Sequence, residues 1–567
     1  MKILICTLNS KYIHSCLAPW CLLSACRAYC KEAISLKVLE GTVNENQDKL
    51  FEKIAEEKAD AVTFSCYIWN IEKTLCLCRK IKSASPDTVI ILGGPEVAYN
   101  QKEILRNNSC VDFVISGEGE IVLPQLLDAL SGGFSPSELD AVSFIDKGEL
   151  VVKNEITGEA FDYPSPYTEE YFAALRGRIA YIESSRGCPF NCAYCLSGRC
   201  GKVRYRSLDE TKREILLLAA SGTKTVKFID RTFNCDNNRA VELLRFIRKN
   251  IGTLIPEGVC FHFEINADIL KSSFIDEVAL FPEGTVQFEV GIQSTNKKTL
   301  ESIGRKCNKE RLFKNIRSLV DIGNCHIHTD LIAGLPFETD ESFTNGFNEC
   351  YFLGANMLQL GFLKLLHGSP LREGECFCEF SSEAPYEVIS TPTMSEADLE
   401  RLHIAEKELD RLYNSGRFPR TLKYLLETTG FTPFELFCFV GERLPDAPLH
   451  LDRYTDEIYG MFASSENIDA EKLRDCMLYD RIASNNSGII PHSLYREDRR
   501  LRKVKEILAE IFPTDKGVNR CLGILYADKT VIFSDYIKKN PVTGEYGVKE
   551  LPFSFFGETF FGFDIDK

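Results

Sequence analysis

The stretch Glu183-Ser-Ser-Arg-Gly-Cys188-Pro-Phe-Asn-Cys192-Ala-Tyr-Cys195 contains three cysteines in the spacing C-x3-C-x2-C, directly after an apolar, strand-like run. Three thiolates on one short loop can bind three irons of a [4Fe–4S] cluster, because soft sulfur ligands suit iron–sulfur chemistry. The fourth iron would keep an open position for another molecule. The spacing therefore indicates catalysis, and the alternatives are a zinc loop or three buried cysteines.

The composition is that of a globular protein of several domains. The chain has 567 residues, 44% of them hydrophobic and 26% charged, which is enough for three or four domains with sizeable cores. The net charge of −15 argues against a broad nucleic-acid surface, which would need a basic face. We therefore expect no nucleic-acid partner.

The location of the protein is predicted from the N-terminus, the apolar runs and the cysteines. The N-terminus resembles a strand rather than a signal peptide, and no apolar run has the length of a bilayer span. The 23 cysteines fit a reducing compartment, in which thiols pack as small apolar groups or bind metal. A cytoplasmic protein without a membrane partner is expected.

Residues 1–130 alternate strand and helix patterns, which predicts a doubly wound parallel sheet. Strands are expected at Lys2–Leu8, Ala61–Ser65, Thr88–Leu92 and Phe113–Ser116, and helices at Ala18–Lys31 and Ile71–Ser83. Such sheets bind ligands at the carboxyl ends of their strands. The loops at those ends contain His14, Ser65, Gly93 and Gly94.

A connector is expected at residues 131–177, and a second α/β domain at 178–370. The connector has a hairpin pattern, Val142–Ile145 and Leu150–Val152. The second domain has six strand patterns, too few for a closed eight-stranded barrel, so a partial (β/α)6 barrel is predicted. These strands are expected at Ile179–Glu183, Thr225–Asp230, Cys260–Ile265, Val286–Ile292, His326–Ile332 and Met357–Leu366.

Polar residues recur at the carboxyl ends of these barrel strands, which is where the chemistry of such folds gathers. They are Asp230, Glu264, Glu289, Gln293 and Asp330, and Arg305 follows a little beyond the fourth strand. Their recurrence beside the cysteine loop predicts one shared site.

Residues 371–567 are predicted to be a mostly helical α+β region of unknown role. Helical patterns cover Ser395–Tyr424, Phe434–Arg443 and Ser493–Phe512, and strand-like alternation covers Cys521–Phe563. No motif with a mechanism occurs in this region, which we expect to close the cavity.

The cysteine loop, with Glu289-Val-Gly-Ile-Gln-Ser294 and Asp330-Leu-Ile-Ala-Gly-Leu-Pro336, resembles the radical S-adenosylmethionine (SAM) superfamily. The N-terminal sheet resembles the cobalamin-binding domain of one subgroup. The resemblance implies a [4Fe–4S] cluster, SAM, and cleavage of SAM to a 5′-deoxyadenosyl radical, with the protein positioning the cofactors. It also implies a small-molecule substrate and an electron donor such as flavodoxin or ferredoxin.

The resemblance also assigns roles to residues of the barrel. Cys188, Cys192 and Cys195 would bind the cluster, and Tyr194 would pack over the cluster or the adenine. Glu264 and Arg305 would hold the amino and carboxylate groups of the methionine part of SAM, the arginine through a charge-assisted pair. The remaining contacts of SAM would be Gln293 and Asp330 with the ribose, and the turn Gly334 to Pro336 with the adenine.

For cobalamin, the resemblance assigns His14, Ser65, Gly93 and Gly94. Two glycines at a strand end let a flat ligand approach the backbone, because neither has a Cβ. Around His14, however, the chain reads Tyr12-Ile-His-Ser-Cys-Leu17, without the Asp-x-His-x-x-Gly box of the family. This departure leaves open whether His14 is the lower cobalt ligand or a loop residue bonded to the backbone.

The leading functional prediction is a cobalamin-dependent radical SAM enzyme that transfers a methyl group to an unactivated carbon. One alternative is a radical SAM enzyme whose N-terminal domain does not bind cobalamin and which performs rearrangement, cyclisation or tRNA methylthiolation. Another is a non-catalytic cobalamin or redox sensor, which would not need Glu264, Gln293, Arg305 and Asp330.

Overall fold

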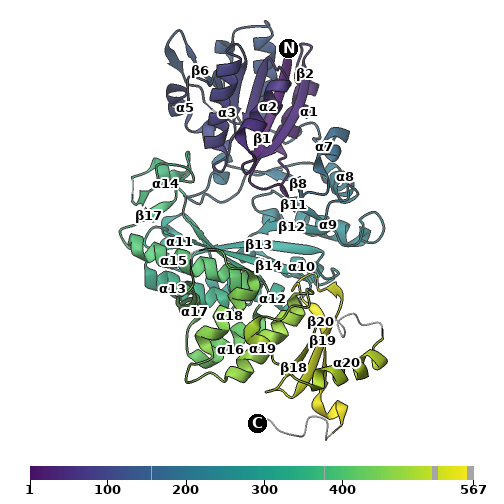
Figure 1. The fold of residues 1–567 in the computed structure, drawn as a ribbon. Helices are drawn as coiled ribbons and strands as arrows, with labels where there is room; N and C mark the ends of the chain where they lie inside the picture. The colour runs from purple at the N-terminus through teal and green to yellow at the C-terminus, as the bar shows by residue number, and fades with distance from the viewer. Residues whose placement is uncertain (155, 376, 446, 514–520, 558–567) are drawn as a thin grey trace.

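The computed structural model describes the whole chain apart from residues 155, 376, 446, 514–520 and 558–567. Three parts follow one another along the chain. Figure 1 shows the N-terminal sheet at one end, the barrel strands in the middle, and the helical C-terminal region with a small sheet at the other end. The predicted strand-like segment Cys521–Phe563 runs partly outside the described residues.

The N-terminal part is a seven-stranded sheet in the order β2-β1-β3-β4-β5-β6-β7. β1 to β5 are parallel, and β6 and β7 are antiparallel. The strands are β1 Lys2–Asn9, β2 Ser35–Thr42, β3 Ala61–Ser65, β4 Val89–Gly93, β5 Phe113–Ile115, β6 Val142–Asp146 and β7 Glu149–Val151. The helices are α1 Ala18–Tyr29, α2 Gln47–Glu56, α3 Ile71–Ala84, α4 Pro95–Ala98, α5 Gln101–Asn107 and α6 Gly119–Leu130.

This sheet confirms the predicted doubly wound class and adds two features to it. β2 was not predicted, although it pairs with β1 along its whole length. The predicted hairpin forms as β6 and β7, and it extends the N-terminal sheet. All five residues of β3 are buried, as expected for a central strand covered on both faces.

The middle part is a six-stranded parallel sheet in the order β15-β14-β13-β12-β11-β8. Its strands are β8 Ala180–Ile182, β11 Thr225–Phe228, β12 Cys260–Ile265, β13 Val286–Gln293, β14 His326–Ala333 and β15 Met357–Phe362. Its helices are α7 Glu169–Leu175, α8 Leu208–Ala219, α9 Asn237–Asn250, α10 Ser272–Val278, α11 Lys297–Ser302, α12 Lys309–Ile322 and α13 Asp340–Tyr351. The predicted partial (β/α)6 barrel is therefore confirmed.

Alternation along the barrel strands separates an apolar face from a polar face. Phe261, Phe263 and Phe288 belong to the buried core, and burying each such side chain contributes about 1.5–3 kcal/mol. The intervening positions, such as Glu264 and Glu289, face the other side of the sheet. The packing of the core therefore directs the ionisable side chains into the barrel.

The C-terminal part is mostly helical, as predicted, and ends in a three-stranded antiparallel sheet. Its helices are α14 Pro370–Glu373, α15 Glu396–Glu408, α16 Pro419–Thr429, α17 Pro433–Gly441, α18 Leu451–Phe462, α19 Ala470–Ser484 and α20 Arg500–Ile511. Its strands are β16 Glu379–Phe380, β17 Val388–Ser390, β18 Leu522–Leu525, β19 Thr530–Lys539 and β20 Tyr546–Pro552.

The helical pattern predicted over Ser395–Tyr424 is not one continuous helix. It is interrupted after a π-helical turn at Leu409–Asn414, because Gly416 adopts a positive φ of 63° and Pro419 begins α16.

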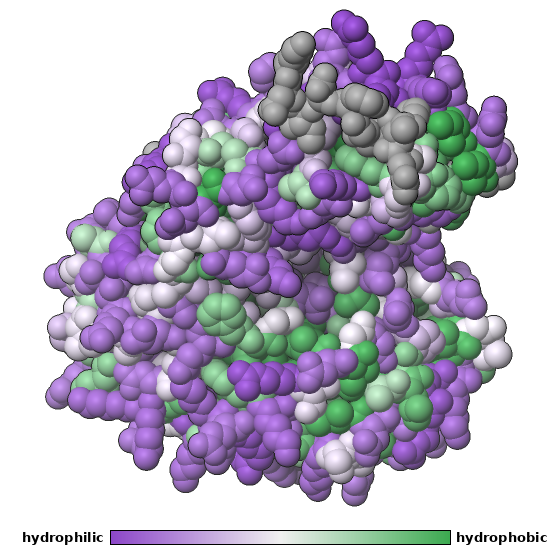
Figure 2. Space-filling model, turned by 90° about the horizontal axis from the view of Figure 1, so that it is seen from below, coloured by the Kyte–Doolittle hydropathy of each residue, from purple (hydrophilic) through white to green (hydrophobic). Residues whose placement is uncertain are grey.

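Seen from the C-terminal end, polar residues cover most of the surface (Figure 2). Among the residues that the structure describes, each helix is too short or too polar to span a lipid bilayer.

Candidate active site

The cysteine loop follows two short strand segments, β8 and β9 Ser185–Arg186. The loop is anchored by backbone hydrogen bonds at its centre: Ala193 N donates to Ile303 O at 2.9 Å, and Ala193 O accepts from Leu371 N at 2.9 Å. These bonds tie the loop to the segment after α11 and to the segment after the barrel.

Asp230 supports the start of the same loop through hydrogen bonds to Ser184 and Ser185. Its side chain does not line the cavity between the N-terminal sheet and the barrel. Its carboxylate accepts hydrogen bonds from the Ser184 amide at 2.7 Å, the Ser184 hydroxyl at 2.5 Å and the Ser185 hydroxyl at 2.8 Å. Burial raises the pKa of Asp230 to about 6, against the effect of these donors. The interpretation of Asp230 as a pocket residue is therefore replaced by a structural role.

Each thiol of the loop has a polar neighbour. Cys188 Sγ lies 3.6 Å from Thr232 Oγ1, and Cys195 Sγ accepts from Ser197 N at 3.4 Å. Cys192 Sγ accepts from Arg305 Nη1 at 3.9 Å. Burial raises the pKa of the Cys188 thiol, and its hydrogen bond with Thr232 only partly opposes this.

The donor set fits an iron–sulfur cluster better than a single metal ion. Among the described residues, no three His, Cys, Asp or Glu side chains converge closely enough to hold one ion. A [4Fe–4S] cluster bonds each cysteine to a different iron, so its ligands stand farther apart than those of zinc. The spacing C-x3-C-x2-C of the three cysteines on one loop suits such a cluster.

Arg305 and Gln293 meet at a bulge in β13. The register with β14 shifts between Gly291 and Gln293, and Gln293 has a positive φ of 74°. Its amide nitrogen folds so closely over Gly291 that a Cβ there would lie 2.0 Å away. Arg305 donates to Gly291 O, whereas its buried Nε has no hydrogen-bond partner in the described part of the chain. A buried guanidinium N–H that lacks an acceptor fits an anionic ligand group at this position.

The acidic side chains of β12, β13 and β14 lie close together. Glu264 and Glu289 are register partners in neighbouring strands, and Asp330 Oδ1 lies 3.0 Å from His328 Nε2. Burial raises the pKa of Glu264 to about 7, because nearby Glu289 and Asp330 add to the effect and Arg231 only partly opposes it. Burial likewise raises the pKa of Asp330.

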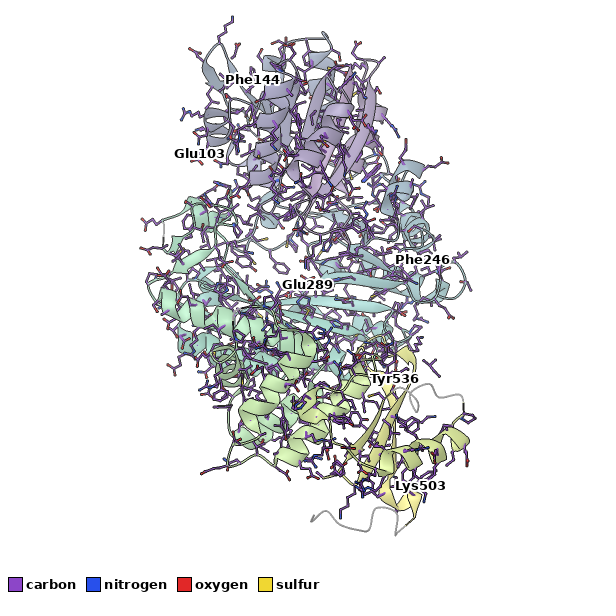
Figure 3. The ribbon with its side chains drawn as sticks, in the orientation of Figure 1. Glu103, Phe144, Phe246, Glu289, Lys503 and Tyr536 are labelled. Carbon is purple, nitrogen blue, oxygen red and sulfur yellow. The ribbon has the colours of Figure 1, made fainter. Side chains whose placement is uncertain are left out.

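Glu289 differs from its neighbours because it is paired. Its Oε2 lies 3.0 Å from both Lys227 Nζ and His262 Nε2. Burial opposes its ionisation, but these two partners lower the pKa of Glu289 to about 2. Figure 3 shows Glu289 on the barrel strands, between the N-terminal sheet and the helical C-terminal region. Glu289 therefore remains a carboxylate and holds the side chains of Lys227 and His262 inside the barrel.

A cavity of about 660 Å³ lies between the N-terminal sheet and the barrel. All four residues assigned to cobalamin line it, and so does Glu264. The cysteine loop contributes its two ends, Gly187 on one side and Leu196 with Ser197 on the other. Further lining residues include Tyr67, Trp69, Tyr99, Tyr181, Arg186 and Arg231.

The wall formed by the sheet has small residues at the ends of β3 and β4, beside aromatic rings and the paired carboxyl groups of Glu118 and Glu120. Gly93 has room for a Cβ, whose nearest neighbour would be Ile115 Cβ at 3.8 Å. Gly94 has none, because its φ is 106° and a Cβ would lie 2.5 Å from Cys66 O. Gly94 is thus required by the turn itself, whereas Gly93 leaves an open surface toward the cavity.

His14 faces the barrel from this wall. Its Nδ1 lies 2.7 Å from the hydroxyl of Tyr181 on β8. Burial lowers the pKa of His14, and Lys11 and Lys227 lower it further, so the imidazole is neutral and Nε2 has no part in that bond. A neutral imidazole with one occupied nitrogen fits a metal ligand.

Of the residues assigned to SAM, Glu264 lines the cavity, whereas Tyr194, Gln293, Arg305, Asp330, Gly334 and Pro336 lie outside its wall, as do the three cysteines themselves. Tyr194 is partly buried beside Cys192 and Arg305, which both influence its pKa. Gly334 is covered by the protein, because a Cβ there would lie 2.5 Å from Val388 Cγ1. Pro336 is buried in the same turn.

The two walls are joined by buried ion pairs that sequence reasoning did not identify. Arg186, two residues before Cys188, contacts Glu118 at 3.2 Å and Glu120 at 2.8 Å. Glu118 also pairs with Arg204. Burial opposes ionisation, but Arg204 and Arg186 lower the pKa of Glu118 to about 2. The sequence signal that could have indicated these ion pairs is the run Gly117-Glu-Gly-Glu120, which follows the end of β5.

Comparison with known families agrees with this arrangement. The model of the Radical SAM superfamily matches residues 182–348, and that of the B12 binding domain matches residues 7–127. The model described as "Protein of unknown function (DUF4080)" matches residues 376–529.

Individual relatives are distant in sequence. A cobalamin-dependent radical SAM methyltransferase, TokK of Streptomyces tokunonensis, is 28% identical over 56% of this chain and 48% of its own length. The chain thus spans about half the length of that relative. An uncharacterized methyltransferase, PH0819 of Pyrococcus horikoshii, is 25% identical over 55% of this chain and 68% of its own length.

A solved structure extends the likeness in fold. The radical SAM methyltransferase TsrM from Kitasatospora setae, with cobalamin and a [4Fe–4S] cluster bound, superimposes with a TM-score of 0.56 at 16% identity. The match covers 78% of this chain and 99% of that one. The chain therefore contains a radical SAM superfamily domain, a B12 binding domain and a DUF4080 domain.

Proposed function

We propose that the protein is a cobalamin-dependent radical SAM methyltransferase. The observation that carries the proposal is that one cavity of about 660 Å³ is bounded both by the ends of the cysteine loop and by His14, Ser65, Gly93 and Gly94. When bound, a reduced [4Fe–4S] cluster would supply the electron that cleaves SAM, and cobalamin would supply the methyl group for an unactivated carbon.

The barrel residues would hold and orient SAM. Cys188, Cys192 and Cys195 would bind the cluster. Arg305 would offer its unpartnered Nε–H to the carboxylate of SAM, as a charge-assisted hydrogen bond. The carboxylate of Glu264 would accept a hydrogen bond from the amino group of SAM.

The remaining assignments concern the adenosine part of SAM. Gln293 and Asp330 would accept or donate hydrogen bonds at the ribose. Tyr194 and the turn Gly334 to Pro336 would support the adenine. For the turn, Val388 already occupies the open face of Gly334, so the contact would come from another backbone group of the turn.

On the opposite wall, Ser65 and Gly93 would contact cobalamin, and His14 would offer Nε2 to the cobalt. The stacked rings of Tyr67 and Trp69, whose centroids lie 4.4 Å apart, would cover its edge. The alternative in which this sheet does not bind cobalamin rests on the absence of the Asp-x-His-x-x-Gly box around His14.

The partners follow from the same chemistry. We propose a small-molecule substrate and a one-electron donor such as flavodoxin or ferredoxin, in a cytoplasmic setting. The net charge of −15 supports neither a nucleic-acid substrate nor a methylthiolation of tRNA.

The test is anaerobic reconstitution with iron, sulfide and hydroxocobalamin, followed by reduction in the presence of SAM. We expect 5′-deoxyadenosine as product and a corrin absorption spectrum that stays with the protein after gel filtration. Formation of 5′-deoxyadenosine without retained corrin would favour the alternative without cobalamin. Retained corrin without 5′-deoxyadenosine would favour the sensor. Comparison of metabolites between cells with and without the gene would then identify the substrate.

A further inference from the structure

Residues 363–390 form a strap that leaves the barrel after β15 and doubles back on itself. Leu363 N donates to Ala333 O at 2.9 Å, and Val388 N donates to Leu363 O at 3.0 Å. Leu365 N donates to Tyr386 O at 3.0 Å. The two ends of the strap are therefore bonded to each other and to the end of β14. Residue 376 within the strap lies outside the described part.

The strap contacts the N-terminal sheet in the segment that follows the Gly93–Gly94 turn in the chain. The hydroxyl of Tyr386 donates to Glu96 Oε1 at 2.5 Å, and these residues are 290 positions apart in the chain. His367 Nε2 lies 3.2 Å from Asn100 Nδ2. Gly368 packs against the ring of Tyr99 so closely that a Cβ would lie 2.3 Å from Tyr99 Cγ.

The same strap also holds the cysteine loop. Leu371 N donates to Ala193 O, between Cys192 and Tyr194. Arg199 donates to Gly368 O, pairs with Glu373 at 3.1 Å, and lies 4.7 Å above the Tyr99 ring. One segment thus contacts both the cysteine loop and the segment after the Gly93–Gly94 turn.

The contact between Tyr386 and Glu96 is shielded from solvent. Glu96 is 4% exposed and Tyr386 is 8% exposed, and the guanidinium of Arg372 lies 4.5 Å from the centroid of the Tyr386 ring. Tyr386 also has a positive φ of 58°, which is unfavourable for a side chain of this size. A buried carboxyl group loses its solvation, so it depends on the donor that the strap provides.

We propose that the strap positions the Gly93–Gly94 turn relative to the cysteine loop, through the hydrogen bond between Tyr386 and Glu96. Because Gly93, Gly94, Pro95 and Ala98 form the cavity wall, Glu96 would act through the turn and Tyr386 through Glu96. Both are positioning residues. Tyr386 lies inside the DUF4080 match, so this contact assigns a role to the first part of that domain. The inference rests on the proposed binding of cobalamin.

The test compares Tyr386→Phe with Tyr454→Phe in the full-length protein reconstituted with its cluster. Tyr454 is a matched control, because its hydroxyl donates to the buried Glu408 at 2.6 Å within the C-terminal helices. Both variants lose one buried hydrogen bond to a carboxyl group. Hydroxocobalamin is titrated by absorbance, and the thermal unfolding midpoint and iron content are measured in parallel.

We expect Tyr386→Phe to weaken hydroxocobalamin binding about 10-fold, the effect of losing one such bond, and Tyr454→Phe to leave it unchanged. Similar drops in the unfolding midpoint would confirm that the two changes cost comparable stability. If Tyr386→Phe does not fold, Glu96→Ala removes the other end of the bond and is expected to give the same loss.

Equal hydroxocobalamin affinity in the Tyr386→Phe and Tyr454→Phe proteins would overturn the inference. Additive losses in a double variant, Glu96→Ala with Tyr386→Phe, would also overturn it, because two ends of one bond must be coupled. Failure of the unaltered protein to bind hydroxocobalamin would overturn the proposed function as well. The two failures are thus distinguishable, because they occur in different proteins.

Discussion

The two walls of the cavity differ in their chemistry. The barrel wall has ionisable groups such as Glu183, Arg186, Arg231 and Glu264. The strand ends of the sheet contribute the small residues Ser65, Gly93, Gly94, Pro95 and Ala98, and the two carboxylates on this side, Glu118 and Glu120, are paired with Arg186. One wall can recognise a ligand by charge and direction. The strand ends of the sheet can recognise a ligand by shape, because glycines let a flat surface approach the backbone.

This difference supports the proposal that the two cofactors bind on separate sides. A zwitterionic ligand such as SAM needs separate partners for its amino and carboxylate groups, and the barrel offers ionisable groups of both signs. A large flat ring needs close approach to the backbone, which the glycine turn of the sheet allows. Changes to the barrel wall should therefore impair SAM chemistry, and changes to the wall of the sheet should impair cobalamin binding.

The largest effect is expected from Cys192→Ala. Removing one of three thiolates leaves the cluster with too few protein ligands, so iron content should fall and 5′-deoxyadenosine should be undetectable. Iron analysis and product chromatography would measure this. Cys76→Ser, in helix α3 of the N-terminal sheet, is the control. Full activity of the Cys192 variant would contradict the cluster assignment.

Arg305→Ala should weaken SAM binding about 10- to 100-fold, the value of one or two charge-assisted hydrogen bonds. Arg305→Lys should not restore it, because lysine lacks the planar fork that contacts both Gly291 and a carboxylate. Equilibrium binding of SAM to the reconstituted protein is the measurement. The control is Arg311→Ala, which removes an exposed arginine that pairs with Asp268. Comparable losses in both variants would reject a specific role.

Substitutions of Gly93 and Gly94 should separate an effect on cobalamin binding from an effect on stability. Gly93→Ala should leave the unfolding midpoint unchanged, because its Cβ meets only an ordinary contact at 3.8 Å, and should weaken hydroxocobalamin binding about 10-fold by crowding the ring. Gly94→Ala should instead destabilise the fold by about 1–3 kcal/mol. Thermal unfolding and absorbance titration would distinguish them. Unchanged cobalamin affinity in the Gly93 variant would remove the shape argument.

The smallest effect is a pH dependence from Glu264. Its pKa of about 7 means that the carboxylate, which we propose as the partner of the amino group of SAM, becomes populated as the pH rises from 6 to 8. SAM binding should strengthen several-fold over that range. Because the folded pKa is raised, ionisation of Glu264 in the unliganded protein also lowers stability as pH rises from its unfolded value to about 7.

Glu264→Gln should flatten the pH dependence of SAM binding, measured by calorimetry at each pH. Glu301→Gln, on the exposed surface of α11, should retain it. A persistent pH dependence in the Glu264 variant would assign the titration to another group.

Much of the barrel could be predicted from the sequence, because its signals are local. Each strand from β11 to β15 appears as an alternation of apolar and polar residues, and its start was predicted within the observed strand. β2 was missed because its residues are only partly buried, so the apolar signal is weak. The break between α15 and α16 was also missed, since one helical pattern continued across Gly416 and Pro419.

The site divides in the same way. The spacing of Cys188, Cys192 and Cys195 on one loop, and the glycine pair after β4, depend on neighbours in sequence and were therefore visible in it. The pairing of Arg186 with Glu118, and of Tyr386 with Glu96, depends on how three parts of the chain pack against each other. Periodicity encodes which face of an element is buried, but not which distant side chain meets it; only the tertiary structure decided that the strap holds both walls of one cavity.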